Sequence, residues 1–339
     1  MRLSARIVKL ELVEPFVIAR DTTEVAEVVW VELEHEGERG FGEAAPNDRY
    51  DESAESSLNY VEEVAGGLGD DPFALDEIME RLPKREYAAR AAIDAALHDL
   101  CGRLVGLPVW RMLGLRRIGP STSWTIVLGG PDEMARKAEK VTEFEGLKLK
   151  LGGRDGQDVE RVRAVRAMWE GPIRVDVNEG WSGSDEALDA LPQLAELGVE
   201  YCEQPLPAGH PEAPALKERS PIPIYVDEDC HTLDNVADCA GRSHGVNIKL
   251  AKSGGIREAL RMVPAARALG LGVMLGCMIE SGLGIAAGAS IASLCNHVDL
   301  DGNHLLREDP WPGVELVDGI QLPSQSPGLG VREEVSSPR

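Results

Sequence analysis

The chain has 339 residues, 43% of them apolar, which is enough for one large or two modest domains. Its 35 basic and 58 acidic residues give a formal net charge of −23, which argues against nucleic acid or anionic membrane partners because phosphates would be repelled. The N-terminus carries no uninterrupted apolar run of a signal peptide, and the longest apolar stretches are too short to cross a membrane, so we expect a cytoplasmic protein.

Alternating apolar and polar residues over 1–43 predict a meander of β-strands. Between residues 52 and 115 the period changes to that of helices, and the alanine-rich stretch AARAAIDAALHDLCGRLVG predicts an amphipathic helix that ends at a glycine. The first third of the chain is therefore expected to form an α+β unit.

Eight short β-rich runs follow, and most are separated by helix-like segments. They are 123–127, 146–151, 173–177, 201–205, 223–228, 245–250, 272–278 and 297–300. A mean spacing of about 25 residues accommodates one strand, one helix and two loops, so we expect parallel strands that close into a barrel. A doubly wound open sheet fits less well, because no G-x-G-x-x-G follows the first strand. Residues beyond 305 are expected to pack back on the N-terminal unit.

Acidic residues end three successive predicted strands: Asp176, Glu203 and Asp227. Parallel barrels place their active sites at these strand ends, and neighbouring strands lie only about 4.8 Å apart. Three carboxylates so close together would repel each other unless a cation stood between them. Oxygen ligands without histidine or cysteine favour Mg²⁺, with Mn²⁺ as a substitute. The alternative is that one or two of these acids pair with a lysine inside the barrel.

Lysines occur on two of the predicted strands. Lys148 and Lys150 alternate with leucines in GLKLKLGG, so both ammonium groups share one strand face. Lys249 ends the sixth predicted strand, which lies opposite the second in an eight-stranded ring. This arrangement suits the removal of a proton from one face of a carbon and its return to the other face. The positive charge of Lys148 favours the neutral form of Lys150 that a base requires. A solvated strand edge is the alternative, and the flanking glycines and leucines argue against it.

Two further groups of polar residues stand at the barrel mouth. Asp299 and Asp301 share one face of the eighth predicted strand, and such a pair makes a site for a cation, although a turn or helix-capping pair is the alternative. Glu280 and Ser281 end the seventh strand, where they would contact a substrate or hold a lysine.

These motifs resemble the enolase superfamily, in its muconate-lactonizing subgroup, and most closely the dipeptide epimerases. The motifs are K-L-K (148–150), D-V-N-E-G-W (176–181), E-Q-P (203–205), V-D-E (226–228), N-I-K (247–249) and D-L-D (299–301). The stretches FVIAR, GFGEAAP, RYDES and PGLGV extend the resemblance nearly from end to end. It implies a (β/α)₇β TIM-like barrel with an α+β capping domain built from the N-terminal third and the C-terminal tail. The implied boundaries are 1–118 for the cap, 119–305 for the barrel and 306–339 for the tail.

The resemblance also implies an isomerase: a Mg²⁺-dependent dipeptide epimerase that inverts the α-carbon of the C-terminal residue. The implied reaction is a two-base 1,1-proton transfer through a metal-stabilised enediolate. Its site residues would be the bases Lys150 and Lys249, the metal ligands Asp176, Glu203 and Asp227, and the substrate contacts Lys148, Asp299, Asp301 and Glu280, with the D-x-D pair holding the free α-ammonium. A small dipeptide is then the expected partner, and a homo-oligomer is compatible with the sequence.

Substrate choice is expected to depend on Arg20 and Arg49, in loops that cover the substrate in this family. A guanidinium there would pair with a side-chain carboxylate, which favours L-Ala-D/L-Glu. The alternative is that either arginine pairs with one of the nearby acids Asp21, Asp48 and Glu52.

Two positions depart from the family pattern. Glu179 stands where many relatives have glutamine, and Asp229 stands where serine usually follows D-E. Extra acid near the metal would favour cationic groups, so an epimerase for cationic dipeptides stays open. His231 is expected to be a loop histidine rather than a metal ligand. A muconate cycloisomerase or o-succinylbenzoate synthase on the same scaffold also stays open, as does a non-catalytic solute-binding barrel.

Overall fold

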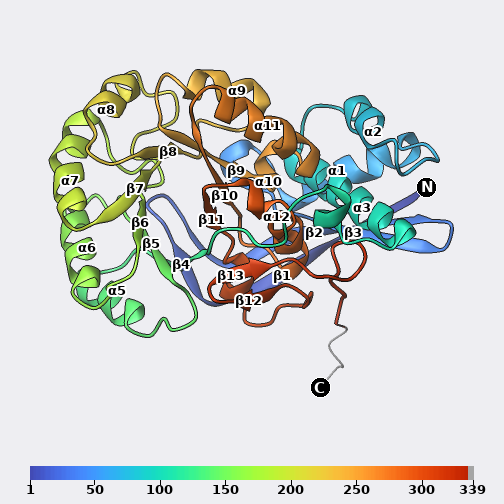
Figure 1. The fold of residues 1–339 in the computed structure, drawn as a ribbon, viewed down its shortest axis with the longest axis horizontal. Helices are drawn as coiled ribbons and strands as arrows, with labels where there is room; N and C mark the ends of the chain where they lie inside the picture. Colours follow the sequence, from blue (N-terminus) through green and yellow to red (C-terminus); the bar gives the residue numbers. More distant parts are fainter. Residues whose placement is uncertain (335–339) are drawn as a thin grey trace.

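The computed structural model describes residues 1–334. The chain begins with an antiparallel sheet. The sheet has the order β1-β2-β3, with β1 (Arg2–Val17), β2 (Thr22–His35) and β3 (Glu38–Ala44), as the meander pattern predicts (Figure 1). The turn between β2 and β3 consists of Glu36 and Gly37, both with positive φ (50° and 85°), as a two-residue type I′ hairpin requires.

Helices follow the sheet and cover one of its faces. They are η1 (Asp48–Tyr50), α1 (Ala54–Val64), η2 (Ala65–Gly67), α2 (Leu75–Arg81), α3 (Tyr87–Val105) and α4 (Val109–Met112). The sequence predicts α3 to be amphipathic, but the helix is buried over nearly its whole length. The reason is that β3 packs against it on one side and α10 (Leu250–Ser253) on another.

Two glycines on β3 allow α3 to approach the sheet closely. A Cβ atom at Gly42 would overlap the backbone carbonyl of Ala92, and one at Gly40 would overlap that of Ala96. The repeated glycines of GFGEA are therefore needed for packing of backbone against backbone.

We expect Gly42→Ala to lower the free energy of unfolding by about 3 kcal/mol or more, because neither backbone can move without disturbing the sheet. Urea unfolding followed by circular dichroism measures the change. Gly66→Ala is the matched control, since no atom lies within 4 Å of the Cβ position there and φ is not positive. Equal stabilities of the two variants would contradict the packing argument.

The barrel consists of eight parallel strands in the order β11-β10-β9-β8-β7-β6-β5-β4. The strands are β4 (Ser123–Ile126), β5 (Gly146–Lys150), β6 (Ile173–Asp176), β7 (Val199–Glu203), β8 (Ile224–Val226), β9 (Gly245–Lys249), β10 (Gly272–Gly276) and β11 (His297–Asp299). Each coincides with one of the predicted β-rich runs, so the predicted barrel is confirmed. The ring closes at a parallel bridge between Thr122 and Val298, beside which the Leu300 amide donates to Thr122 Oγ1 (2.7 Å).

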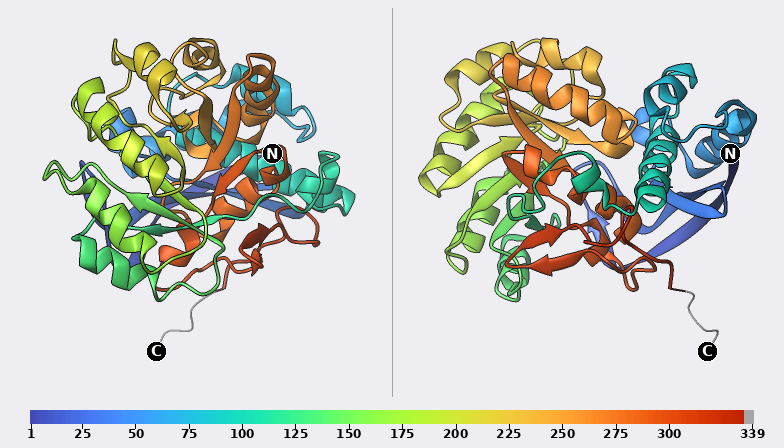
Figure 2. Two further views of the ribbon diagram at one scale, coloured as in Figure 1. Left: turned by 60° about the vertical axis from the view of Figure 1, so that its left-hand side comes forward. Right: turned by 45° about the vertical axis from the view of Figure 1, so that its right-hand side comes forward.

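Helices on the outside connect the barrel strands, as Figure 1 shows. Besides α10 they are α5 (Pro131–Ala138), α6 (Asp158–Arg166), α7 (Ser184–Glu196), α8 (Ala213–Arg219), α9 (Leu233–Cys239), α11 (Ile256–Ala268), α12 (Gly282–Ala289) and η3 (Ala292–Leu294). A further short helix, η4 (Gly302–Leu305), follows the last barrel strand. Figure 2 shows the barrel helices on one side of the molecule and α1, α2 and α3 on the other. In the described range, no helix is both long enough and apolar enough to cross a membrane.

The C-terminal tail forms a small hairpin of β12 (Glu315–Val317) and β13 (Ile320–Leu322) and then returns to α3. Asp99 on α3 accepts a hydrogen bond from the Leu329 amide (2.6 Å), and Gly328 forms a bridge with Pro108. These contacts agree with a tail that completes the cap. The boundaries at 118/119 and 305/306 stay predictions, and residues 335–339 lie outside the described range.

Candidate active site

A cavity of about 510 Å³ lies between the antiparallel sheet and the C-terminal ends of the barrel strands. The cap contributes Phe16, Ile18 and Arg20 to its wall. The predicted site residues from the barrel that line it are Lys148, Lys150, Lys249, Asp299 and Asp301. The fold thus brings together residues from three predicted motifs that are far apart in the sequence.

The three predicted metal ligands are buried below this cavity, with Asp176 and Glu203 fully inaccessible and Asp227 2% exposed. One oxygen of each carboxylate is held by a supporting donor. These pairs are Asp176 Oδ1 with the Asn178 amide (2.9 Å), Glu203 Oε1 with Asn247 Nδ2 (2.7 Å), and Asp227 Oδ1 with Lys252 Nζ. The supporting donors fix the orientation of each carboxylate and leave its second oxygen to the residues that face it.

The second oxygens contact the predicted site lysines. Lys150 Nζ lies 2.7 Å from Asp176 Oδ2, Lys148 Nζ 2.7 Å from Glu203 Oε2, and Lys249 Nζ 2.9 Å from Asp227 Oδ2. Over residues 1–334, no three acids, histidines or cysteines are gathered closely enough to enclose a metal ion. Each of the three acids is thus paired with a lysine inside the barrel.

Charge interactions shift the pKa values of these groups in the directions expected for a tightly packed ionic cluster. Burial raises the pKa of Glu203, and the Asp176 carboxylate raises it further. Burial alone would lower the pKa of Lys249, but the Asp227 and Glu203 carboxylates raise it. Burial opposes ionisation of Asp227, yet Lys249 and Lys252 lower its pKa. The acids repel one another and need nearby positive charge to stay ionised.

The donor set fits Mg²⁺. It offers three buried carboxylates from adjacent strands, each oriented by a supporting hydrogen bond, and contains no histidine or cysteine. A divalent cation would supply the positive charge that the lysines supply here, and would compete with them for the second oxygens of Asp176, Glu203 and Asp227.

Lys150 and Lys249 line the cavity from opposite sides, because β5 and β9 are four strands apart in the eight-stranded order. They are 7% and 9% exposed, and Lys150 also lies over the ring of Phe16, 5.7 Å from its centroid. The sequence predicts that Lys148 favours the neutral form of Lys150. The Asp176 carboxylate contacts both ammonium groups, at 3.4 Å from Lys148 and 2.7 Å from Lys150.

Asp299 and Asp301 both face the cavity. Asp301 Oδ2 accepts from the Thr125 amide (2.7 Å), and Asp299 Oδ2 accepts from Lys148 (2.7 Å). Asp299 Oδ1 is buried and has no hydrogen-bond partner. Burial and the charge of Asp299 raise the pKa of Asp301 to about 6. An ammonium group bound here would relieve the repulsion and satisfy the free oxygen.

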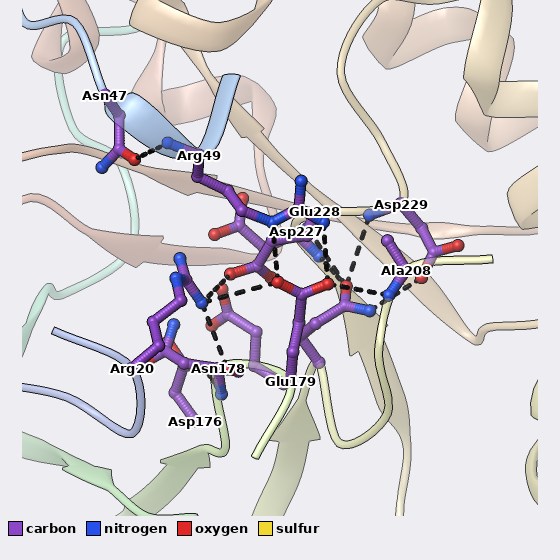
Figure 3. Close-up of polar contacts among 12 residues, drawn as sticks. Arg20, Asn47, Arg49, Asp176, Asn178, Glu179, Ala208, Asp227, Glu228 and Asp229 are labelled. Atoms are coloured by element: carbon purple, nitrogen blue, oxygen red, sulfur yellow. Dashed lines mark hydrogen bonds and ion pairs between the residues drawn. The ribbon is translucent and has the colours of Figure 1, made fainter. Parts of the chain in front are cut away.

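The two cap arginines bind barrel carboxylates rather than the nearby cap acids (Figure 3). Arg20 NH1 lies 2.8 Å from Glu228 Oε1 and donates to the Asn178 carbonyl (3.1 Å). Arg49 donates two hydrogen bonds to Glu179, from Nε (2.8 Å) and from NH2 (2.9 Å). Arg20 lines the cavity, whereas the lining residues of the described range do not include Arg49.

Three other predicted residues lie outside the cavity lining within the described range. Glu280 accepts from the Met278 amide (2.9 Å), and burial raises its pKa to about 7. His231 stacks on Tyr50, with ring centroids 4.9 Å apart, and makes a contact between barrel and cap. Asp229 binds Arg242 at 3.1 Å.

Two supporting residues have no role predicted from the sequence. Asn247 shares its strand face with Lys249, and this period-two spacing is a signal that could have placed it in the site. Lys252 is only 1% exposed and binds Asp227 from the short helix α10, and no strand or helix periodicity points to that contact.

Comparisons with known families and proteins agree with this architecture. The family model described as "Enolase C-terminal domain-like" matches residues 133–334. The model of the "Mandelate racemase / muconate lactonizing enzyme, N-terminal domain" matches residues 2–114.

Several similar proteins are epimerases whose names give different substrates. The chain is 39% identical over 329 residues to the L-Ala-D/L-Glu epimerase of Bacteroides thetaiotaomicron, covering 95% of this chain and 85% of that protein. It is 38% identical over 338 residues to the L-Ala-D/L-amino acid epimerase of Pedosphaera parvula, covering 95% and 97%. The crystal structure of a dipeptide epimerase from Enterococcus faecalis, complexed with Mg and L-Leu-L-Tyr, matches with a TM-score of 0.92 and 31% identity, covering 97% of this chain and 98% of that one.

Proposed function

The chain belongs to the mandelate racemase/muconate lactonizing enzyme family of the enolase superfamily, and from this membership and its site we propose that it is a Mg²⁺-dependent dipeptide epimerase. The substrate would be a dipeptide with a free N-terminal amine, with L-Ala-D/L-Glu as the favoured example. The reaction would invert the α-carbon of the C-terminal residue.

The observation that carries the proposal is the combination of two lysines on opposite sides of one cavity with an acid pair at its mouth. Lys150 and Lys249 would act on the two faces of the α-carbon, one removing the proton and the other returning one. The Asp299 and Asp301 carboxylates would hold the substrate ammonium and thereby set the distance from the N-terminus to the reacting carbon.

Asp176, Glu203 and Asp227 would hold the metal, for which we propose Mg²⁺, with Mn²⁺ as a substitute. When bound, the metal supplies positive charge that stabilises negative charge on the substrate's carboxylate. Lys148, which is 1% exposed and in contact with Asp299 and Glu203, would keep those two acids in place and contact the substrate carboxylate.

Incubating the protein with L-Ala-L-Glu and Mg²⁺ in D₂O tests the proposal. We expect L-Ala-D-Glu to appear and deuterium to enter the α-carbon of the glutamyl residue, both followed by proton NMR. Chelation with EDTA should stop the reaction, and added Mg²⁺ should restore it. The proposal is wrong if L-Ala-L-Glu and a panel of other L-Ala-L-Xaa dipeptides all stay unlabelled.

Competing functions explain fewer features of the site. Muconate and succinylbenzoate substrates carry no ammonium, so a cycloisomerase or an o-succinylbenzoate synthase has no use for the Asp299 and Asp301 pair. A solute-binding barrel has no use for two lysines facing each other. The case for cationic dipeptides rests on Glu179 and Asp229, but Arg49 and Arg242 neutralise these two acids. A cytoplasmic location and a homo-oligomer stay predictions.

A further inference from the structure

We propose that Glu179 is a specificity-determining residue, because it withdraws Arg49 from the substrate and competes with the substrate for Arg20. A cavity with two unpaired guanidinium groups would strongly prefer an acidic C-terminal side chain over a neutral one. With Glu179 present, this preference would be weaker. The inference rests on the proposed function, since it concerns the side chain of the residue that is inverted.

Glu179 is held firmly in a loop that leads from β6. It and the preceding Asn178 have positive φ values of 67° and 47°, which turn the chain so that the carboxylate points toward the cap (Figure 3). Glu179 Oε1 accepts a hydrogen bond from the Ala208 amide (2.8 Å), which fixes the carboxylate from the barrel side. Its side chain is 12% exposed, while those of its partners Arg49 and Arg20 are 37% and 30% exposed, so its ion pairs are partly exposed.

Arg49 uses one edge of its guanidinium group on Glu179. The Nε and NH2 atoms donate in parallel to the two carboxylate oxygens, the strongest geometry available to an arginine and a carboxylate. This ion pair links η1 of the cap to the barrel. The edge formed by Nε and NH2 is therefore not free to bind a substrate carboxylate.

Arg20 is the guanidinium that lines the cavity, and it is shared between two acids. Its NH1 atom lies 2.8 Å from Glu228 Oε1 and 3.7 Å from Glu179 Oε2. When both glutamates are ionised, the two arginines and the two glutamates together carry no net charge. A substrate carboxylate must therefore compete with Glu179 and Glu228 for Arg20, whereas a neutral side chain avoids this competition.

Glu179→Gln tests this inference, since glutamine keeps an acceptor for the Ala208 amide but removes the charge. We expect the ratio of kcat/KM for L-Ala-L-Glu to that for L-Ala-L-Leu to rise about fivefold, which is the effect of one partly exposed ion pair. Asp229→Asn is the matched control. Asp229 holds the neighbouring Gly209 amide (2.8 Å) and pairs with Arg242 in the barrel, so its loss should lower both rates equally and leave the ratio unchanged.

A second variant distinguishes the ion pair between Arg49 and Glu179 from direct binding of the substrate by Arg49. It also replaces Glu179→Gln as the test if that variant folds poorly. Arg49→Gln combined with Glu179→Gln exchanges the ion pair for an uncharged pair and still removes one competitor of Arg20, so the ratio should again exceed that of the wild type. A ratio that falls in the double variant means that Arg49 itself binds the substrate, and an unchanged ratio in both variants also overturns the inference. Failure of the wild-type protein to invert either dipeptide would instead refute the proposed function.

Discussion

Replacing Lys249 with alanine is expected to slow epimerisation by at least about 10³-fold, because the variant loses the amine that we propose exchanges the α-proton on that side of the cavity. Lys249 ends β9 opposite Lys150 on β5, so each lysine reaches a different face of the α-carbon. Lys150→Ala should cause a similar loss. The rate is measured as the appearance of L-Ala-D-Glu from L-Ala-L-Glu with saturating Mg²⁺.

Deuterium exchange tests the role of each lysine separately. Each single-lysine variant retains one base, so it should still exchange the α-proton of one diastereomer in D₂O without inverting it. Lys249→Ala and Lys150→Ala should label opposite members of the L-Ala-L-Glu and L-Ala-D-Glu pair. Lys84→Ala, at an exposed position of the cap, is the control and should behave as the wild type. Wild-type inversion by Lys249→Ala would rule out the two-base mechanism.

The second large effect is expected for Asp301→Asn, which should lower kcat/KM for L-Ala-L-Glu by about 10²-fold or more. The reason is that the variant loses a buried charge that faces the substrate ammonium. The asparagine oxygen can still accept from the Thr125 amide, so the fold should be unchanged. Because the pKa of Asp301 is raised to about 6, the wild-type carboxylate is protonated below that pH and ionised above it. The part of the fall of kcat/KM near pH 6 that comes from this ionisation should therefore be absent in the variant.

A substrate without the ammonium provides the matched control. N-acetylation of L-Ala-L-Glu should reduce the wild-type rate strongly and the Asp301→Asn rate little, so the two enzymes should become similar on the acetylated substrate. If Asp301→Asn instead processes L-Ala-L-Glu at the wild-type rate, the acid pair does not bind the amine. A one-base reaction on another substrate would then gain support.

The barrel could be predicted because its strands are short and mostly apolar, and because six of the eight, β5 to β9 and β11, end in a charged residue or are followed directly by one. The three carboxylates and the lysines were therefore found from local patterns. Partners of the cap arginines could not be found in this way, since Arg49 and Glu179 are 130 positions apart and meet only when the cap closes over the barrel. The nearly complete burial of α3 also escaped prediction, because the periodicity of a helix does not reveal that Gly40 and Gly42 let a strand pack against its backbone.

The place where the barrel closes has a consequence for how the protein would respond to its ligand. The β4 and β11 edges meet at the single bridge between Thr122 and Val298, and side chains complete the join: Thr122 accepts from the Leu300 amide, and Asp301 accepts from the Thr125 amide. A join with few backbone hydrogen bonds is the part of a barrel that opens most easily in local fluctuations. Since Asp301 also faces the cavity, a bound ammonium would hold this seam closed, and amide protons at Thr125 and Leu300 would exchange with solvent more slowly once substrate is present.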